Sequence, residues 1–387
     1  MALFENLISA FKGGDDTRVP LAPGILAGWM PAFAAASASS GYTYEKGVDQ
    51  GFLTNPVAQR AVRIVAEGIG QAPLASTDTD LKALVCATSA GQPLIETLAA
   101  HLLLHGNGYV QIIKDASGKP VELFALRPDR VSVVAGDDGW PRAYEYRIAR
   151  DVVRMPLEDE DGWPGLIHIK AMHPLDDQYG AGALAAAHQA VMIHNAAAQW
   201  NRALLENAAR PSGALVYETP DHAGLTQDQF DRLKAELEAA FSGSGNAGRP
   251  MLLDGGLKWQ SIALSPADMD FATLKSAAAR EIALAFGVPP MLLGLPGDNT
   301  YSNYREANRA LWRLTLLPLA TKLFSALREG LEPWFKDAEL SVDLDQVTAL
   351  SEDRERLWKQ VSDADFLSRA EKRQMLGLPA EEDANDA

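Results

Sequence analysis

Apolar residues recur every three or four positions in five stretches of the chain, and this spacing predicts amphipathic helices. After the second of these stretches, apolar and polar residues alternate in short segments, which is typical of β-strands. Short polar turns such as 115–119 join several of the segments, so we expect a small, largely antiparallel sheet and an α+β fold. The predicted helices are 55–70, 93–105, 180–209, 265–286 and 301–330, and the predicted strands are 108–114, 121–126, 130–134, 144–148 and 167–170.

The run 265–333 predicts two long helices joined by a mobile loop. The first helix should end at Gly287, because glycine readily adopts the left-handed conformation and the two prolines that follow cannot continue a helix. The glycine-rich stretch 294–299 then forms the loop. Pro318 lies within the second helix and should kink it.

The other segments have shorter patterns. Residues 338–342 are expected to form a strand that returns to the sheet. Ser351 begins a charged helix, and Ser368 with Glu371 forms a capping box for a last short helix. The segment between the two long helices is predicted to be a small α/β insert, with strands 214–217, 250–253 and 257–262 and a helix at 226–241.

These boundaries divide the chain into eight parts. Ordered structure should begin near Thr54, because the residues before it are rich in Pro, Ala, Ser and Gly. The parts are an N-terminal arm (1–41), an α+β region (42–179), an alanine-rich helix (180–209), the insert (210–264), a second long helix (265–288), a loop (289–300), a helix with a return strand (301–350) and a charged C-terminal part with an acidic tail (351–387).

Charge and composition narrow the possible functions. The chain has 387 residues, enough for two or three domains, and a formal net charge of −16. This acidic excess argues against a simple nucleic-acid binder, but it suits a surface along which phosphates slide without being held. No segment reads as a transmembrane helix or a secretory signal. The one cysteine, Cys86, has apolar neighbours and is expected to be a buried structural thiol.

Two histidines are the strongest candidates for chemistry. His101 and His105 are spaced so that they share one face of a predicted helix. No HExxH motif or cysteine–histidine cluster accompanies them, and two ligands make a poor zinc site, so a structural role is favoured. A metal-dependent hydrolase that uses this pair with nearby carboxylates is the alternative. The segment 243–249 (GSGNAGR) lacks the lysine and hydroxyl of a phosphate-binding loop, and we expect no cofactor, no metal and no catalytic residue.

Six motifs carry a resemblance to a known family. The longest is EIALAFGVPPMLLGLPGDNTYSNYREANRALW at 281–312. In their order and spacing, the motifs resemble those of the portal protein family of tailed double-stranded DNA bacteriophages, in its compact siphovirus form, over about 54–379. The short C-terminal part and the alanine-rich composition also fit a prophage or a gene transfer agent particle. The other motifs are LLLHGNGYVQI at 102–112, LRPDRVSV at 126–133, DDQYGAGALAAA at 176–187, LLENAARPSGAL at 204–215 and FLSRAEKRQMLGLP at 366–379.

The resemblance implies a ring of usually twelve subunits at one capsid vertex, with a channel through which double-stranded DNA is packaged and later ejected. The implied partners are the terminase large subunit, a head–tail adaptor and the major capsid protein. Assembly would take place in the bacterial host cytoplasm, without a membrane. In the family's terms, the parts would be a wing (42–179 and 301–350), a stem (180–209 and 265–288), a clip (210–264), a tunnel loop (289–300) and a short crown (351–387). Another ring-forming virion connector is an alternative, but such proteins are usually much shorter.

The resemblance also implies candidate sites for DNA. The tunnel loop would contact the duplex by steric fit, through Leu292, Gly294, Leu295, Pro296, Gly297, Asp298 and Asn299. Three basic residues of the predicted stem helices, Arg202, Lys275 and Arg280, are candidates for rings that touch phosphates. Ordinary salt bridges between subunits are the alternative role for each of these three.

Overall fold

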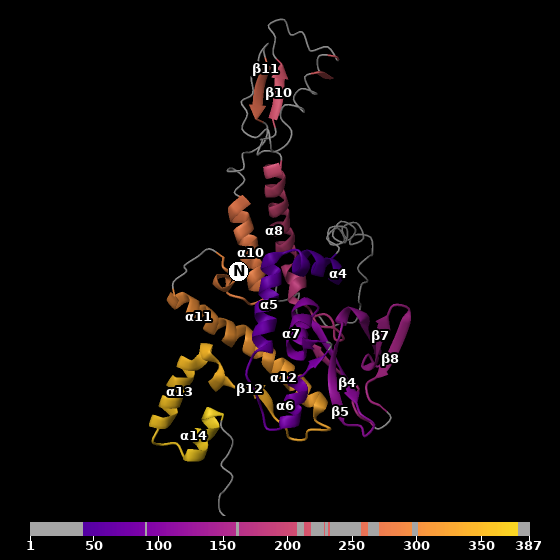
Figure 1. Cartoon of the computed structure of the whole chain (residues 1–387), viewed down its shortest axis with the longest axis vertical. Helices are drawn as coiled ribbons and strands as arrows, with labels where there is room; N and C mark the ends of the chain where they lie inside the picture. The colour runs from indigo at the N-terminus through magenta and orange to yellow at the C-terminus, as the bar shows by residue number, and fades with distance from the viewer. Residues whose placement is uncertain are drawn as a thin grey trace, which may run out of the picture. The chain divides into compact units, whose positions relative to one another are not determined.

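A computed structural model describes residues 42–89, 91–159, 162–206, 213–217, 228, 231–232, 257–261, 271–295 and 301–377. The chain divides into two compact units, 1–43 and 44–387. All the helices and strands considered below belong to the second unit, and Figure 1 draws the described residues in colour.

One helix, α5 (Pro56–Gly70), lies at the centre of the main apolar core. Asn55 caps it, as the sequence predicted, and its side-chain oxygen accepts hydrogen bonds from the backbone N–H groups of Val57 and Ala58, both at 3.0 Å. The helix packs against α7 (Leu94–Leu104) and α10 (Phe271–Ala285). Its buried face is almost continuous, with Ala58, Ala61, Val62, Val65, Ala66 and Ile69.

Two three-stranded antiparallel sheets replace the single sheet that we expected. The first has the order β5-β4-β9 and is covered by α7 and by α12 (Leu317–Leu331), and the second has the order β6-β7-β8. β8 was not predicted, because its residues are exposed on both faces and the strand therefore has no alternating pattern. The strands are β4 (Asn107–Lys114), β5 (Pro120–Leu126), β6 (Val131–Ala135), β7 (Pro141–Ile148), β8 (Asp151–Pro156) and β9 (Leu166–Lys170).

The strand predicted at 338–342 is present but has a different partner. β12 (Leu340–Val342) pairs antiparallel with β1 (Leu74–Ser76), in a two-stranded sheet separate from the larger two. β1 leads to α6 (Thr79–Cys86), which was not predicted. Cys86, the last residue of α6, is exposed, so the expectation of a buried thiol was wrong. Leu84 and Val85 occupy the buried face, and the next position along the helix is turned away from it.

Short elements complete the N-terminal half of the second unit. They precede α5 or connect α6 to α7 and β5 to β6. They are α4 (Tyr44–Gly47), the π-helical turn η1 (Val48–Leu53), β2 (Thr88–Ser89), β3 (Gln92–Pro93) and the 3₁₀ turn η2 (Pro128–Arg130).

The alanine-rich helix, α8 (Ala183–Glu206), is present, and α10 confirms the end predicted for the second long helix. Between them, two of the three strands predicted for the insert are present, as β10 (Gly213–Tyr217) and β11 (Leu257–Ser261), and they pair antiparallel with each other. The predicted strand 250–253, most of the helix 226–241 and the start of the second long helix before Phe271 lie outside the described residues.

The long helix predicted at 301–330 is divided into three parts at the proline. α11 (Tyr301–Leu311) leads into the π-helical turn η5 (Trp312–Leu316), and α12 (Leu317–Leu331) follows with Pro318 in its first turn. Proline has no N–H and its ring clashes with the carbonyl four residues earlier, so the wider turn before it accommodates the ring. The irregularity therefore lies where the sequence predicted a kink.

The C-terminal elements agree with the sequence. α13 (Ser351–Asp363) begins at Ser351, and α14 (Arg369–Leu376) has the predicted capping box of Ser368 and Glu371. Before α13, the chain forms two 3₁₀ turns, η6 (Leu344–Gln346) and η7 (Thr348–Leu350).

One helical run, Asn303–Leu331, is long and apolar enough to cross a membrane by length and composition alone, a test that core helices also pass. In its second half, the buried residues of α12 belong to the main core, so we interpret this run as a core helix. These residues are Ala320, Leu323, Phe324, Leu327 and Leu331.

Candidate functional site

The candidate site is the pair of long helices, α8 and α10, and the places where they join the core. The two helices lie side by side and run in opposite directions (Figure 1). Alanine dominates the buried positions, and small side chains allow helices to approach closely. From Ala183 to Asn201, α8 has no Asp, Glu, Lys or Arg. The buried alanines are Ala187, Ala190 and Ala197 on α8 and Ala278, Ala279 and Ala283 on α10.

The first junction with the core lies just before α8, where two glycine motifs meet backbone to backbone. A Cβ atom on Gly180 would lie 2.0 Å from the carbonyl oxygen of Gly106, and one on Gly182 would lie 2.6 Å from that of Leu104. Gly106 also has a φ of +85°, which side chains rarely permit. The motifs HGNG and YGAG, which carried part of the family resemblance, are therefore required by this close packing.

Hydrogen bonds from the side chain of Asn107 stabilise this junction. Its side-chain Oδ1 accepts a hydrogen bond from the N–H of Gly180 at 2.7 Å, and its Nδ2 donates to the Gly180 carbonyl at 3.3 Å. His168 donates from Nε2 to the same Oδ1 at 3.1 Å, so its Nδ1 is free to accept from the Tyr144 hydroxyl at 3.4 Å. Burial, followed by the charge of Lys170, lowers the pKa of His168 to about 3, so the histidine is neutral here.

The second junction joins the middle of α8 to the start of α5. Asn55 is 1% exposed, and its Nδ2 lies 3.1 Å from Nδ1 of His194 and donates to Oδ1 of Asn195 at 2.8 Å. Asn195 in turn donates from Nδ2 to the Gln50 carbonyl at 2.9 Å. Because the Oδ1 of Asn55 already caps α5, all four of its hydrogen-bonding positions are used. Burial, followed by the positive charge of Lys275, lowers the pKa of His194.

The third junction follows α10. Gly287 has a φ of +65° and ends the helix, as predicted. Thr315, in the π-helical turn η5, donates a hydrogen bond from its hydroxyl to the Gly287 carbonyl at 2.6 Å. The chain continues into the 3₁₀ turn η4 (Pro290–Leu293), and Gly294 ends that turn in the left-handed conformation. This hydrogen bond therefore connects the left-handed residue Gly287 to the π-helical turn η5, and each helps to fix the position of the other.

The structure describes only part of the predicted tunnel loop. Leu292 is half-buried and packs against the main core, next to Gly294 and Leu295. Pro296, Gly297, Asp298 and Asn299 lie outside the described residues. Leu292 therefore helps to hold the start of the loop on the core, and a DNA contact by these residues stays a prediction.

The three predicted basic residues lie on the helix pair but differ in exposure. Arg202 on α8 and Arg280 on α10 are exposed, whereas Lys275 on α10 is half-buried. Lys275 is close enough to His194 for its charge to lower the pKa of that histidine, so it lies near the contact between the helices. A phosphate contact by any of the three stays a prediction.

The histidine pair proposed for the alternative hydrolase, His101 and His105, lies in an environment of buried packing contacts. Burial, followed by the charge of His105, lowers the pKa of His101 to about 4. His105 is the C-cap of α7, and its ring packs edge-on against Tyr44 with the centroids 4.7 Å apart. Within the part of the chain that the structure describes, no three His, Cys, Asp or Glu residues are placed to hold a metal ion. No observation here favours the hydrolase.

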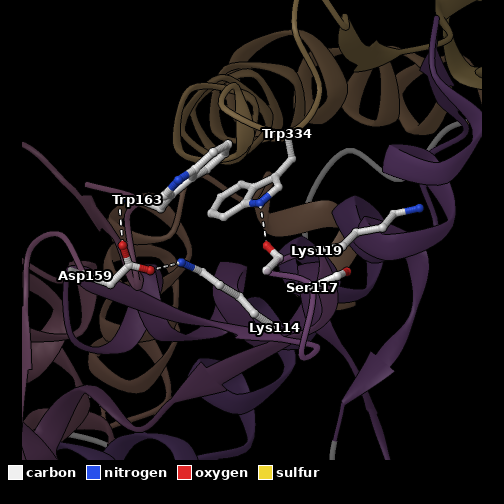
Figure 2. Close-up of a pocket in the computed structure, with 7 residues that line it drawn as sticks. Lys114, Ser117, Lys119, Asp159, Trp163 and Trp334 are labelled. Carbon is white, nitrogen blue, oxygen red and sulfur yellow. Dashed lines mark hydrogen bonds and ion pairs between the residues drawn. The ribbon is translucent and has the colours of Figure 1, made fainter. Parts of the chain in front are cut away.

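A cavity of about 230 Å³ lies between the β4–β5 turn and the end of α12 (Figure 2). The rings of Trp163 and Trp334 are 4.8 Å apart in it, and Trp334 donates to the Gly118 carbonyl at 2.8 Å. Lys114 lies 4.9 Å from the centre of the Trp334 ring and pairs with Asp159 at 2.5 Å. Because these polar groups already bind one another, we interpret the residues around the cavity as contacts that hold the end of α12 on the sheet.

Comparison with known proteins identifies the class of protein to which a chain with this helix pair and α+β region belongs. The family model described as phage portal protein matches residues 56–377, and the chain belongs to this family. It is 36% identical over 356 residues to an uncharacterised protein of Rickettsia bellii (strain RML369-C), covering 88% of this chain and 90% of that one. It is 30% identical over 225 residues to the probable portal protein of Streptomyces phage phiC31, covering 56% and 47% of the two chains.

A solved structure described as the neck of a native gene transfer agent particle, computed with C12 symmetry, contains a similar chain. The two chains are 45% identical, with a TM-score of 0.67, and the match covers 90% of this chain and 98% of that one. The resemblance to portal proteins and to a gene transfer agent particle is thereby confirmed.

Sequence reasoning missed the residues that hold the helix pair in place. Asn107 and Asn195 have no motif of their own, because their roles depend on partners 73 and 145 positions away in the sequence. The paired glycines on either side of Asn107 and around Ala181 were a usable signal. Glycines inside otherwise regular segments often mark a close approach of two backbones.

Proposed function

We propose that the chain forms a ring-shaped portal at one vertex of a virus-like particle, and that double-stranded DNA passes through the ring during packaging and ejection. The observation that carries this proposal is the family match over 56–377. The similar chain in a neck with C12 symmetry supports a ring of twelve subunits. In a closed ring of this kind each subunit contacts its two neighbours head to tail, through two different surfaces.

The parts of the fold take the following roles in the proposal. Residues 42–179 and 301–350 form the wing, α8 and α10 form the stem, and 210–264 form the clip. The tunnel loop is 289–300, and 351–387 form a short crown. The stem assignment is supported by the packing of α8 on α10 and by the uncharged stretch of α8, because neighbouring subunits can pack on a neutral helix face without burying unpaired charges.

Acidic charge supports the proposed channel. Twelve copies of a chain with a formal charge of −16 give a strongly negative ring. Such a ring repels phosphates, so the duplex can move without being trapped. The exposed Arg202 and Arg280 would then supply brief phosphate contacts, with a smaller contribution from the half-buried Lys275.

The proposed partners follow from the position at a vertex. The wing would contact the major capsid protein, and the clip would bind the terminase large subunit during packaging and a head–tail adaptor afterwards. The complete particle would be assembled in the bacterial cytoplasm. We propose no enzymatic activity for this chain, so the energy for packaging would come from the terminase.

Negative-stain microscopy of the purified full-length protein tests the ring. Rings with a central hole are expected, and mass photometry should give an integral multiple of the 41.7 kDa subunit. A monodisperse monomer at every protein and salt concentration would contradict the proposal. Metal analysis of the same sample tests the hydrolase alternative, which requires a stoichiometric metal that is lost in His101→Ala.

The DNA contacts are tested in particles. Deletion of residues 296–299 should leave rings intact while reducing the amount of nuclease-protected DNA. Arg202→Gln and Arg280→Gln should weaken packaging more than Arg356→Gln, a change of an exposed arginine on α13. Full packaging and retention with the loop deleted would refute its assigned role without affecting the ring proposal.

A further inference from the structure

The C-terminal helices are attached to the rest of the unit differently from the other elements. In the described residues, the main apolar cluster extends no further along the chain than Val342 and the second no further than Leu166, so η6, η7, α13 and α14 belong to neither. Their main contact with the preceding elements is between η7 and α11. We define residues 343–377 as the C-terminal module.

The module is held together internally. Val361 of α13 and Leu376 of α14 are buried, and α13 packs on α14. Arg354 pairs with Asp345 through Nε at 2.5 Å and donates from Nη2 to the Leu376 carbonyl at 3.0 Å. The module can therefore keep its own structure when its contact with α11 changes.

Ion pairs connect the module to α11. Glu352 uses both carboxylate oxygens, one to Arg305 at 2.5 Å and the other to Arg309 at 2.6 Å. The two arginines are four residues apart, so they lie on one face of α11. Arg309 also lies 3.5 Å from Asp353 and 3.0 Å from Glu306. Its side chain is only 16% exposed, so it is at the centre of the contact.

We propose that Arg305, Arg309, Glu352 and Asp353 form an ionic clamp that docks the C-terminal module reversibly on α11. The module lies outside the main core, and Val347 and Leu350 are buried at η7, where it contacts α11. The ion pairs add a salt-sensitive part to its docking free energy. Half of the Glu352 side chain is exposed, and salt screens exposed ion pairs. The clamp therefore loosens as the salt concentration rises, while the module stays folded.

The reversible contact has a defined mechanical consequence. α11 begins at Tyr301, and η5 and α12 continue from its other end into the main core. A force on the module is therefore transmitted through Glu352 to α11, and the other end of this helix is fixed in the main core. The inference concerns docking within one chain and does not depend on the ring or on DNA.

The clamp is tested by measuring the distance between α11 and α13 in full-length protein. The exposed native cysteine is replaced (Cys86→Ser), and spin labels are attached at Tyr304→Cys and Lys359→Cys, two exposed positions. Labelled chains are diluted with unlabelled ones, so that only distances within a subunit contribute. Double electron–electron resonance is recorded in 0.05 M and 1 M NaCl, for which the Debye length changes from about 14 to about 3 Å.

One narrow distance is expected at low salt and a broad distribution at high salt. Glu352→Gln and Arg309→Met should broaden the distribution already at low salt, with the undocked fraction raised roughly tenfold. Glu352→Asp, which retains the charge, should restore part of the docked population. The matched control is Glu355→Gln, which removes the same charge from an exposed residue of α13 that has no ion-pair partner among the described residues.

The control and the helix content make the outcome decisive. A narrow distribution in Glu352→Gln at both salt concentrations would overturn the clamp, as would equal broadening in Glu355→Gln. Far-UV circular dichroism separates undocking from unfolding, because an undocked module keeps the helical signal. Broadening that is accompanied by loss of the α13 and α14 signal would also contradict the proposal, since it would show that the module does not survive release.

Discussion

Replacing Asn55 by Asp should reverse the pH dependence that this site gives to stability. The variant keeps the oxygen that caps α5, but a carboxylate oxygen replaces the amide nitrogen. That oxygen would face Nδ1 of His194 and Oδ1 of Asn195, which now accept hydrogen bonds at 3.1 and 2.8 Å. Three acceptors would then meet in a site where the Asn55 side chain is 1% exposed.

The magnitude follows from the hydrogen bonds that are lost. His194 relieves part of this conflict by carrying its ring proton on Nδ1 and donating to the carboxylate, but Oδ1 of Asn195 keeps no donor, at a cost of about 1–3 kcal/mol, so we expect Asn55→Asp to be destabilised by about 2 kcal/mol at pH 8. A proton on His194 or on the new carboxylate restores a donor. Lowering the pH from 8 to 6 should therefore recover about 1–2 kcal/mol relative to the wild type.

In the native protein, the stability that His194 contributes changes with pH in the opposite direction. Burial and the charge of Lys275 lower the pKa of His194 there, so the unfolded chain takes up its proton first as the pH falls. The native histidine therefore contributes stability above its unfolded pKa of about 6.5 and loses it below. In Asn55→Asp, the folded-state pKa is raised, and the contribution is present at low pH and lost as the pH rises.

Thermal unfolding by scanning calorimetry at a fixed protein concentration measures the effect. The difference in Tm between Asn55→Asp and wild type should shrink as the pH falls from 8 to 6. Asn55→Ala is the matched control, because it also leaves His194 and Asn195 without their donor but adds no titratable group. A difference that stays constant with pH in Asn55→Asp would refute the hydrogen-bond assignment.

Two further predictions concern the junction before α8. Gly180→Ala should destabilise the fold by more than 3 kcal/mol or prevent folding, because its Cβ would lie 2.0 Å from the Gly106 carbonyl oxygen. The control is Gly165→Ala, where no atom lies within 4 Å of the added Cβ, and it should shift Tm by no more than a few degrees. The pKa of His168, about 3 in the folded protein, lies below the unfolded value. The contribution of His168 to the free energy of unfolding should therefore be complete above pH 6.5 and fall by about 2 kcal/mol between pH 6.5 and 5. Calorimetry of His168→Gln should show a shallower fall of stability with pH, and an unchanged pH dependence would contradict the neutral state of His168.

The sequence predicted those elements whose signals are local. Asn55-Pro56, Gly287 and the pair Ser368 and Glu371 determine helix ends through bonds to residues at most a few positions away, and all of them occur in the structure. β8 had no such signal, and the N-cap of α6, Asp78, was not recognised as one. The strand is exposed on both faces, and α6 is a short helix of eight residues with weak periodicity.

The candidate site was predicted less completely, because it depends on tertiary contacts. The family resemblance found the motifs around Gly106 and Gly180, but nothing in either motif says that the two backbones touch. The exposure of Cys86 likewise depends on the direction in which the last turn of α6 faces. Apolar neighbours in the sequence predicted burial, but in a helix consecutive residues point about 100° apart.

The three junctions of the helix pair are held by different kinds of contact, and this difference determines where the pair can move relative to the core. The junction at Asn107 combines a close backbone approach with buried hydrogen bonds, and the junction at Asn55 consists of hydrogen bonds that use every position of its side chain. A small displacement at either would break several bonds at once. The junction at Gly287 has one side-chain hydrogen bond, from Thr315, and otherwise rests on the burial of Phe286 and Val288 in the main core. Apolar contacts are not directional, so movement of the helix pair relative to the core should take place at the end of α10, while the start of α8 remains fixed.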